Sequence, residues 1–172
     1  IQKILEITGK KYITDVWPNL ELFIHGAVNF QPYKQQFLKL IPKAGMNYYE
    51  TYNASEGFFG IQDQSNSEEM LLMLDYGIFY EFIPIDDIHS SNPKVLTLSE
   101  VELNQNYAIV ISTNAGLWRY KIGDTVCFTS LDPFRIRITG RTAHFINAFG
   151  EELIVENAER AISETCIKSG AV

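Results

Sequence analysis

The sequence predicts a mixed α/β fold in which a short strand–helix–strand unit is followed by a series of antiparallel strands. Between residues 20 and 52, two apolar extended segments flank a segment with helical spacing, which is typical of a mainly parallel sheet. From Gly57 onward, short apolar runs alternate with turn sequences, which indicates hairpins and therefore an antiparallel sheet or a small barrel. The apolar fraction of 46% is that of a packed globular protein.

The first third of the chain supplies the strand–helix–strand unit. Gly9 is a stop signal for a first helix. Pro32 suits the first turn of a second helix, and Pro42 closes it. In order, we expect the end of a helix over Lys3–Lys10, a buried strand over Leu20–His25 that ends at Gly26, a helix over Pro32–Ile41 with Tyr33, Phe37, Leu40 and Ile41 on one face, and an extended segment over Asn47–Tyr52.

The remainder is predicted to be rich in short strands separated by turns that contain Gly, Asn, Asp and Pro. The polar segment Gln62–Glu68 is predicted to be an exposed loop, and Glu156–Lys168 has the spacing of a helix. The expected strands are Phe58–Ile61, Met70–Asp75, Ile78–Ile83, Tyr107–Thr113, Leu117–Lys121, Asp124–Thr129 and Arg135–Thr139. A domain boundary is expected either near Leu131–Pro133 or around Arg141, where the hairpin series ends.

Charge and composition exclude several classes of partner. Fourteen basic and 21 acidic side chains give a net charge of −7, which argues against nucleic acid or an anionic membrane as the main partner. A phosphate ligand must therefore be held by backbone amides, a metal ion or a few local cations. Cys127 and Cys166 are expected to be reduced packing residues. With no transmembrane run and no secretion signal visible, we expect a cytoplasmic protein.

The block YNASEG, Tyr52–Gly57, follows one expected strand and precedes another. A small residue such as Ala54 lets a flat ring lie against the backbone, and Ser55 offers a hydroxyl to a phosphate oxygen. Glu56 offers the hard oxygen ligand that Mg²⁺ prefers beside substrate phosphates. The alternative is a simple turn with an exposed glutamate.

The block WRYKIGD, Trp118–Asp124, is predicted to be a strand that runs into a Gly-Asp turn. Asp124 at such a turn can accept both hydroxyls of a ribose, as acidic residues do in other nucleotide sites. The alternative is an ordinary hairpin turn. Trp118 and Tyr120 are expected to pack on the sheet.

The third block, GRTAHFINAFGEEL, spans Gly140–Leu153. Arg141 can contact a ribose or a phosphate as a fixed cation, or can be a surface arginine at a turn. The sequence contains neither a GxGxxG nor a GxxxxGK[ST] phosphate loop.

These three blocks, with WPNLELFIHG ahead of them and YEFIP between them, resemble the acyl acid-amido synthetases of the auxin-responsive promoter family, in its bacterial form. That family belongs to the adenylate-forming superfamily, which also includes acyl-CoA synthetases and luciferases. The resemblance runs from about Trp17 to about Ala161. It implies that residues 1–133 are the end of a large adenylating domain, α/β over 1–57 and β-rich over 58–133, and that 134–172 begin a small C-terminal domain.

The resemblance implies an ATP-dependent ligase that joins a small carboxylic acid to an amine such as an amino acid through an acyl-adenylate, with Mg²⁺ as a further cofactor. By position, Glu56 matches the metal-associated glutamate, Ser55 the phosphate-contacting hydroxyl and Asp124 the ribose-binding aspartate. Tyr52 and Ala54 match the adenine-side wall, Arg141 the arginine near the domain hinge, and Gly26 the lining of the acyl pocket.

Two alternatives stay open. The first is an adenylate-forming enzyme that passes the acyl group to a thiol such as coenzyme A. The second is a non-catalytic binding module. The superfamily's phosphate loop is not among these 172 residues, so we expect an internal piece of a longer protein that is inactive by itself.

Overall fold

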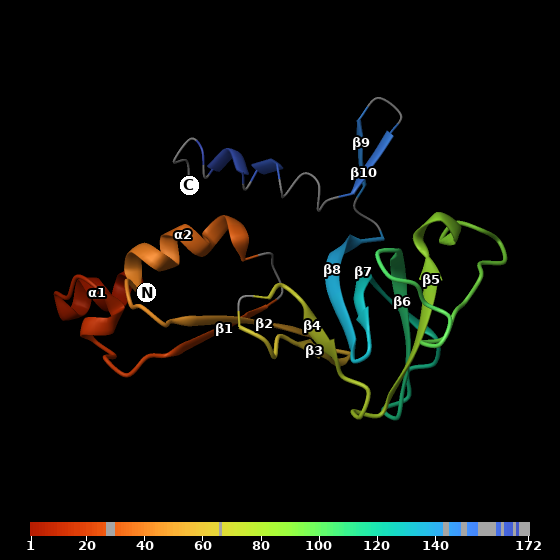
Figure 1. Ribbon diagram of the computed structural model, residues 1–172, viewed down its shortest axis with the longest axis horizontal. Helices are drawn as coiled ribbons and strands as arrows, with labels where there is room; N and C mark the ends of the chain where they lie inside the picture. The colour runs from red at the N-terminus through yellow and green to blue at the C-terminus, as the bar shows by residue number, and fades with distance from the viewer. Residues whose placement is uncertain are drawn as a thin grey trace.

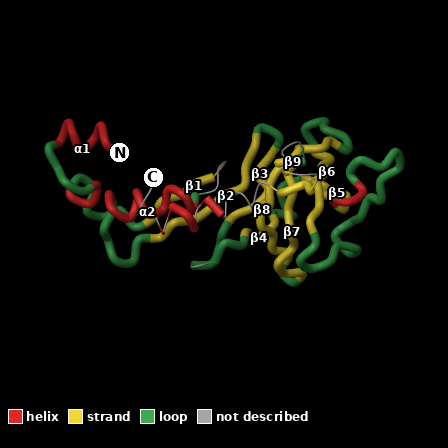
Figure 2. Tube along the Cα trace, turned by 90° about the horizontal axis from the view of Figure 1, so that it is seen from above, coloured by secondary structure: helices red, strands yellow, loops and turns green. Residues whose placement is uncertain are grey.

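Most of the strands belong to one eight-stranded sheet, with two helices at one end of the molecule (Figures 1 and 2). The computed structural model describes residues 1–26, 30–65, 67–142, 145–148, 151–154, 161–162, 164–166 and 168. The strand order in the large sheet is β1-β2-β3-β4-β8-β7-β6-β5, and β9 and β10 form a separate antiparallel pair. The elements are α1 Gln2–Thr8, η1 Ile13–Asp15, β1 Leu22–Gly26, α2 Gln31–Leu40, β2 Asn47–Ala54, β3 Gly57–Ile61, β4 Met70–Leu72, β5 Ile78–Pro84, η2 Ile85–Asp87, β6 Asn106–Thr113, β7 Tyr120–Leu131, β8 Phe134–Arg141, β9 Phe145–Ala148 and β10 Glu151–Ile154.

The expected strand–helix–strand unit is confirmed as β1, α2 and β2. β1 and β2 pair in parallel, with Phe23 opposite Tyr48 and His25 opposite Glu50. The helix lies over the aromatic side of this pair, where the Phe37 ring is 4.7 Å from the Phe23 ring between centroids. The chain reverses between β1 and β2 through a helix, as parallel strands require.

The prediction that Leu20–His25 is a buried strand is wrong for one of its faces. Leu22 and Ile24 are exposed, whereas Phe23 and His25 lie under the helix. The same helix buries Ile41 at its C-terminal end but leaves Tyr33 exposed, because Phe30 takes the place beside Phe37 on the sheet. A continuous apolar run cannot reveal which of its two faces receives a covering layer.

The antiparallel series is confirmed over β3 to β8, with the expected turns between the strands. One expected turn is wrong: Leu117–Lys121 and Asp124–Thr129 are not two strands joined at Gly123-Asp124. β7 runs from Tyr120 to Leu131 without a break at this point, and residues 117–119 lie before it. Its pairing with β6 steps from Lys121 directly to Thr125. Gly123, with φ 92°, absorbs the extra residues as a bulge, a backbone conformation that glycine adopts without strain.

The main core lies within the antiparallel strands and is rich in aromatic rings. Phe59, Phe82 and Phe128 are fully buried, and Phe82 meets Phe128 edge to face at 5.0 Å between centroids. Tyr52 from β2 joins this cluster, with its ring 4.9 Å from that of Phe59. The core therefore ties the parallel unit to the antiparallel strands.

The sheet must curl to bring these strands around one core. Four steps separate β2 from β7 in the strand order, which would put them about 19 Å apart in a flat sheet. The Tyr52 hydroxyl nevertheless lies 2.9 Å from an Asp124 carboxylate oxygen. Within the described residues the sheet is open, with β1 and β5 at its two edges.

The remaining expectations concern the ends and the cysteines. Helix α1 ends at Gly9 in the left-handed conformation, as expected. Cys127 is buried, Cys166 is partly exposed, and no disulfide joins them. Residues 156–160 of the expected last helix lie outside the described part of the chain, whereas 161–162, 164–166 and 168 are helical. No helix in the described part is long and apolar enough to cross a membrane.

Candidate functional site

Three of the predicted site residues meet although they come from three different strands. The Tyr52 hydroxyl of β2 donates a hydrogen bond to Asp124 Oδ2, and Arg141 Nε of β8 lies 2.9 Å from Asp124 Oδ1. Asp124 and Arg141 are direct cross-strand partners in the β7–β8 ladder. The carboxylate is therefore held from two sides by groups that stabilise its charge.

The bulge at Gly123 presents Asp124 at this point. An ideal Cβ at Gly123 would lie 3.8 Å from the Arg141 guanidinium and 3.9 Å from the Thr142 hydroxyl. The Gly123 carbonyl accepts hydrogen bonds from the Thr142 amide and the Thr142 hydroxyl. These bonds link the end of β8 to the bulge in β7, so the backbone segments that carry Asp124 and Arg141 are fixed relative to each other.

The three partners differ in exposure. The Arg141 side chain is 57% exposed and the Asp124 side chain 17%, whereas Tyr52 is 5% exposed as a residue. Burial, and then the neighbouring Asp124 carboxylate, raise the pKa of the Tyr52 hydroxyl above its ordinary value. Tyr52 is therefore a protonated hydrogen-bond donor, and the Asp124 side chain stays partly exposed to solvent.

Ser55 and Glu56 lie in the turn between β2 and β3, three and four residues beyond Tyr52. Ser55 is exposed and Glu56 is partly exposed. Within the described part of the chain, neither side chain makes a hydrogen bond or an ion pair. Both groups are thus available to a ligand on the same strand end that carries Tyr52.

Tyr52 and Ala54 differ in their surroundings. Ala54 is exposed at the end of β2, where a flat ring can reach the backbone. The Tyr52 ring, predicted to wall an adenine, is instead packed on Phe59, and its hydroxyl is the part that faces the other site residues. A buried ring lacks the open face that stacking on a base requires.

Gly26 ends β1 beside Thr51 of β2. A Cβ at Gly26 would lie 2.6 Å from the Thr51 carbonyl oxygen, so only glycine fits this close approach of two backbones. Residues 27–29 lie outside the described part of the chain, so the predicted role of Gly26 in an acyl pocket stays a prediction.

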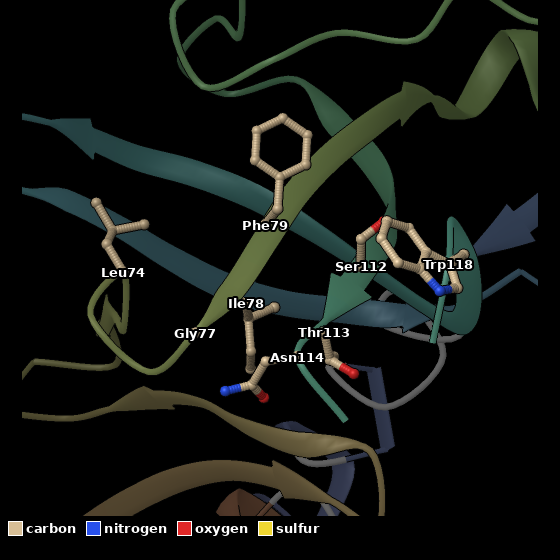
Figure 3. A pocket seen from close by; sticks show the side chains of 8 residues that line it. All are labelled: Leu74, Gly77, Ile78, Phe79, Ser112, Thr113, Asn114 and Trp118. Atoms are coloured by element: carbon tan, nitrogen blue, oxygen red, sulfur yellow. The ribbon is translucent and has the colours of Figure 1, made fainter. Parts of the chain in front are cut away.

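Trp118 is exposed, contrary to the expectation that it packs on the sheet. The residue is 82% exposed and lines an open pocket with Leu74, Ile78 and Phe79 (Figure 3). The next residue, Arg119, has φ 47°, its guanidinium pairs with Glu81 of β5, and its amide donates to the Ser112 hydroxyl of β6. None of the predicted site residues lines this pocket.

Sequence reasoning missed Glu50, which lies two residues before Tyr52 on the same face of β2. Burial, and then the neighbouring Glu68 carboxylate, raise the pKa of Glu50 to about 7. Glu68 is itself held by Gln31, whose amide donates to its carboxylate. The sequence did offer one signal for it: Glu50 is a charged residue at a position of β2 where the alternation of the strand predicts an inward-facing side chain.

We expect the shifted pKa of Glu50 to make the chain less stable as pH rises from about 4.5 to about 7. In this window the folded state holds a proton that the unfolded state has released, so deprotonation favours unfolding. With partial exposure allowed for, the effect is about 1–2 kcal/mol. Urea unfolding across this range measures it. Glu50→Gln should flatten the profile, whereas Glu102→Gln, at an exposed position, should not; identical slopes in all three proteins would contradict the assignment.

Comparison with known proteins gives two matches to family models. Residues 1–46 match the GH3 family N-terminal domain, and residues 71–141 match the GH3 family central domain. Indole-3-acetic acid-amido synthetase GH3.3 of Arabidopsis thaliana is 30% identical over 124 residues, which are 68% of this chain and 20% of that protein. Jasmonoyl--L-amino acid synthetase JAR4 of Nicotiana attenuata is 35% identical over 81 residues, which are 44% of this chain and 14% of that protein.

Solved structures give the same fold. The structure described as GH3.15 acyl acid amido synthetase aligns with a TM-score of 0.69 at 17% identity, covering 90% of this chain and 28% of that one. The chain thus spans about a fifth of the length of the GH3.3 relative and more than a quarter of that structure.

Proposed function

The chain belongs to the GH3 family, and we propose from this that the complete protein carrying it is an ATP-dependent ligase that joins a small carboxylic acid to an amine such as an amino acid. The reaction would pass through an acyl-adenylate. The names of the similar proteins, amido synthetases for indole-3-acetic acid and for jasmonoyl–amino acid products, support an acid and an amine as substrates.

The observation that carries this proposal is the convergence of Asp124, Tyr52 and Arg141 from three strands. The Ser55–Glu56 turn follows Tyr52 by three and four residues along the chain. Asp124 is proposed to accept hydrogen bonds from the ribose hydroxyls of ATP. Arg141 supplies a local cation, which a chain of net charge −7 needs in order to hold a phosphate. Ser55 is proposed to donate its hydroxyl to a phosphate oxygen.

Glu56 fits a magnesium ion held jointly by protein and nucleotide. Mg²⁺ usually binds through one or two carboxylates together with substrate phosphates and waters. Glu56 is partly exposed and has no competing side-chain partner in the described residues, and no group of three or more metal-binding side chains gathers there. This donor set suits a metal ion that arrives with ATP. When bound, such an ion would neutralise charge on the phosphates.

The chemistry asked of these side chains is electrostatic. Forming an acyl-adenylate requires stabilisation of charge on the transferring phosphoryl group more than an acid–base pair. The site supplies a carboxylate for the sugar, a cation, a hydroxyl and a second carboxylate for the metal. The carboxylic acid substrate is itself the nucleophile, so none is required of the protein.

We propose that the small C-terminal domain begins at about Arg141 and not at residue 134, where the resemblance places it. The alternative position, near Pro133, falls in the turn that joins β7 to β8 within one sheet. Arg141 is the last residue of β8, so the division at residue 141 leaves the large sheet intact.

The test is ATP–pyrophosphate exchange by the complete protein with a panel of small carboxylic acids. Exchange that depends on one class of acid supports adenylation. Adding amino acids or coenzyme A in the presence of that acid then separates amide from thioester formation, since the product forms only with the true acceptor. If no acid supports exchange and calorimetry shows no AMP binding, the ligase proposal fails and a non-catalytic module is left.

A further inference from the structure

We infer that Tyr52 is a positioning residue, whose hydroxyl fixes the Asp124 carboxylate in the orientation that receives a ribose. This inference rests on the proposed function, because it assigns Asp124 to the sugar of the nucleotide. In this role Tyr52 acts through its hydroxyl group, while its ring stays packed in the core.

The contact is well placed for such a part. The Tyr52 oxygen lies 2.9 Å from Asp124 Oδ2, across 72 positions of the chain. The ring behind it is packed against Phe59 and belongs to the main core cluster. A donor anchored in a packed core has little freedom to move, so its hydrogen bond defines where the carboxylate points.

The chemistry of the pair also fits. A phenol stays protonated in this buried position, since burial and the nearby carboxylate both raise its pKa. It can therefore donate to the carboxylate at any working pH. A hydrogen bond to an ionised acceptor is shorter and stronger than one between neutral groups.

The Asp124 carboxylate has enough hydrogen-bond acceptor sites to bind the sugar in addition to its two protein partners. An ionised carboxylate offers about four lone-pair sites. Tyr52 occupies one site on Oδ2 and Arg141 one on Oδ1, so about two remain, one for each ribose hydroxyl. Of the two protein partners, Tyr52 is buried and Arg141 is more than half exposed, so Tyr52 is the fixed one.

The experiment is the Tyr52→Phe variant of the complete protein, which keeps the ring and removes the hydroxyl. We expect the KM for ATP in pyrophosphate exchange to rise about tenfold while kcat changes less than about threefold. The preference for ATP over 2′-deoxy-ATP should shrink, because a misplaced Asp124 carboxylate no longer accepts a hydrogen bond from the 2′-hydroxyl. A purely structural role would lower the use of both nucleotides equally and leave that ratio unchanged, which would overturn the inference.

Two further variants keep the outcomes separate. Tyr80→Phe removes another buried tyrosine hydroxyl, one that donates to the Met73 carbonyl, and should leave the nucleotide preference intact. Asp124→Asn should abolish the preference for ATP over 2′-deoxy-ATP. If Asp124→Asn has no effect on nucleotide use, the proposed function fails. If it does and Tyr52→Phe does not, only the positioning role fails.

Discussion

Replacing Asp124 with alanine is expected to lower kcat/KM for ATP in the complete protein by at least about 100-fold. The change removes the acceptor proposed for both ribose hydroxyls. It also strips Arg141 of its ion-pair partner and leaves the buried Tyr52 hydroxyl without an acceptor. The site thus loses a ligand contact and its internal order together. ATP–pyrophosphate exchange at varied ATP concentration measures the loss.

A loss of activity in Asp124→Ala that comes from unfolding must be distinguished from one that comes from the altered site. An unsatisfied buried hydroxyl costs about 1–3 kcal/mol of stability, so thermal unfolding of the variant should be followed in parallel. Asp124→Asn keeps an acceptor for Tyr52 and serves as the milder variant. Asp75→Ala, at an exposed position in the β4–β5 turn, is the matched control and should exchange normally. Near-normal ATP use by folded Asp124→Ala would remove the residue from the site.

Local signals predicted most of the elements. Helical spacing and a proline at the first turn placed α2 within a residue of its observed bounds, and turn sequences separated the antiparallel strands in the observed order. These signals act over a few residues, so they are visible in a single sequence. β4 is shorter than expected: its ladders with β3 and β8 cover only Met70–Leu72, and beyond them the Met73 amide still donates a hydrogen bond to the Phe59 carbonyl.

The errors arise where distant pairing overrides a local pattern. Gly123-Asp124 is typical of a tight turn, yet β6 pairs with β7 on both sides of it and keeps β7 continuous. Trp118 has the character of a packing residue, but it is exposed in the loop that joins β6 to β7. Neither outcome follows from spacing, because each depends on strands that lie elsewhere in the chain.

The candidate site, like the fold, was predicted only in part from the sequence. The blocks around Asp124 and Arg141 were found from their residue types, and the ladder makes the two residues direct partners. The contact between Tyr52 and Asp124 was not foreseen, since it depends on the curl of the whole sheet. Glu50 escaped notice because its raised pKa comes from burial and from Glu68, a residue of a separate loop.

Replacing Glu56 with alanine is the second change with a large expected effect. We expect kcat for adenylation in the complete protein to fall about 100-fold, because the metal ion that neutralises phosphate charge would lose its protein ligand. Stability should change by less than about 0.5 kcal/mol, since the Glu56 side chain is partly exposed and makes no hydrogen bond or ion pair within the described residues. This combination distinguishes Glu56 from Asp124, whose removal disturbs both site and packing.

The dependence on magnesium decides the role of Glu56. A lost metal ligand should raise the Mg²⁺ concentration needed for half-maximal exchange, and Glu56→Asp should recover part of the loss because it restores a carboxylate. Affinity for AMP, measured without metal, should stay close to that of the unchanged protein, since Asp124 and Arg141 remain in place. Ser55→Ala, in the same turn, controls for disturbance of the turn itself and should leave the Mg²⁺ dependence unaltered. A Glu56→Ala enzyme with an unchanged Mg²⁺ requirement would show that the β2–β3 turn serves the nucleotide in some way other than through the metal.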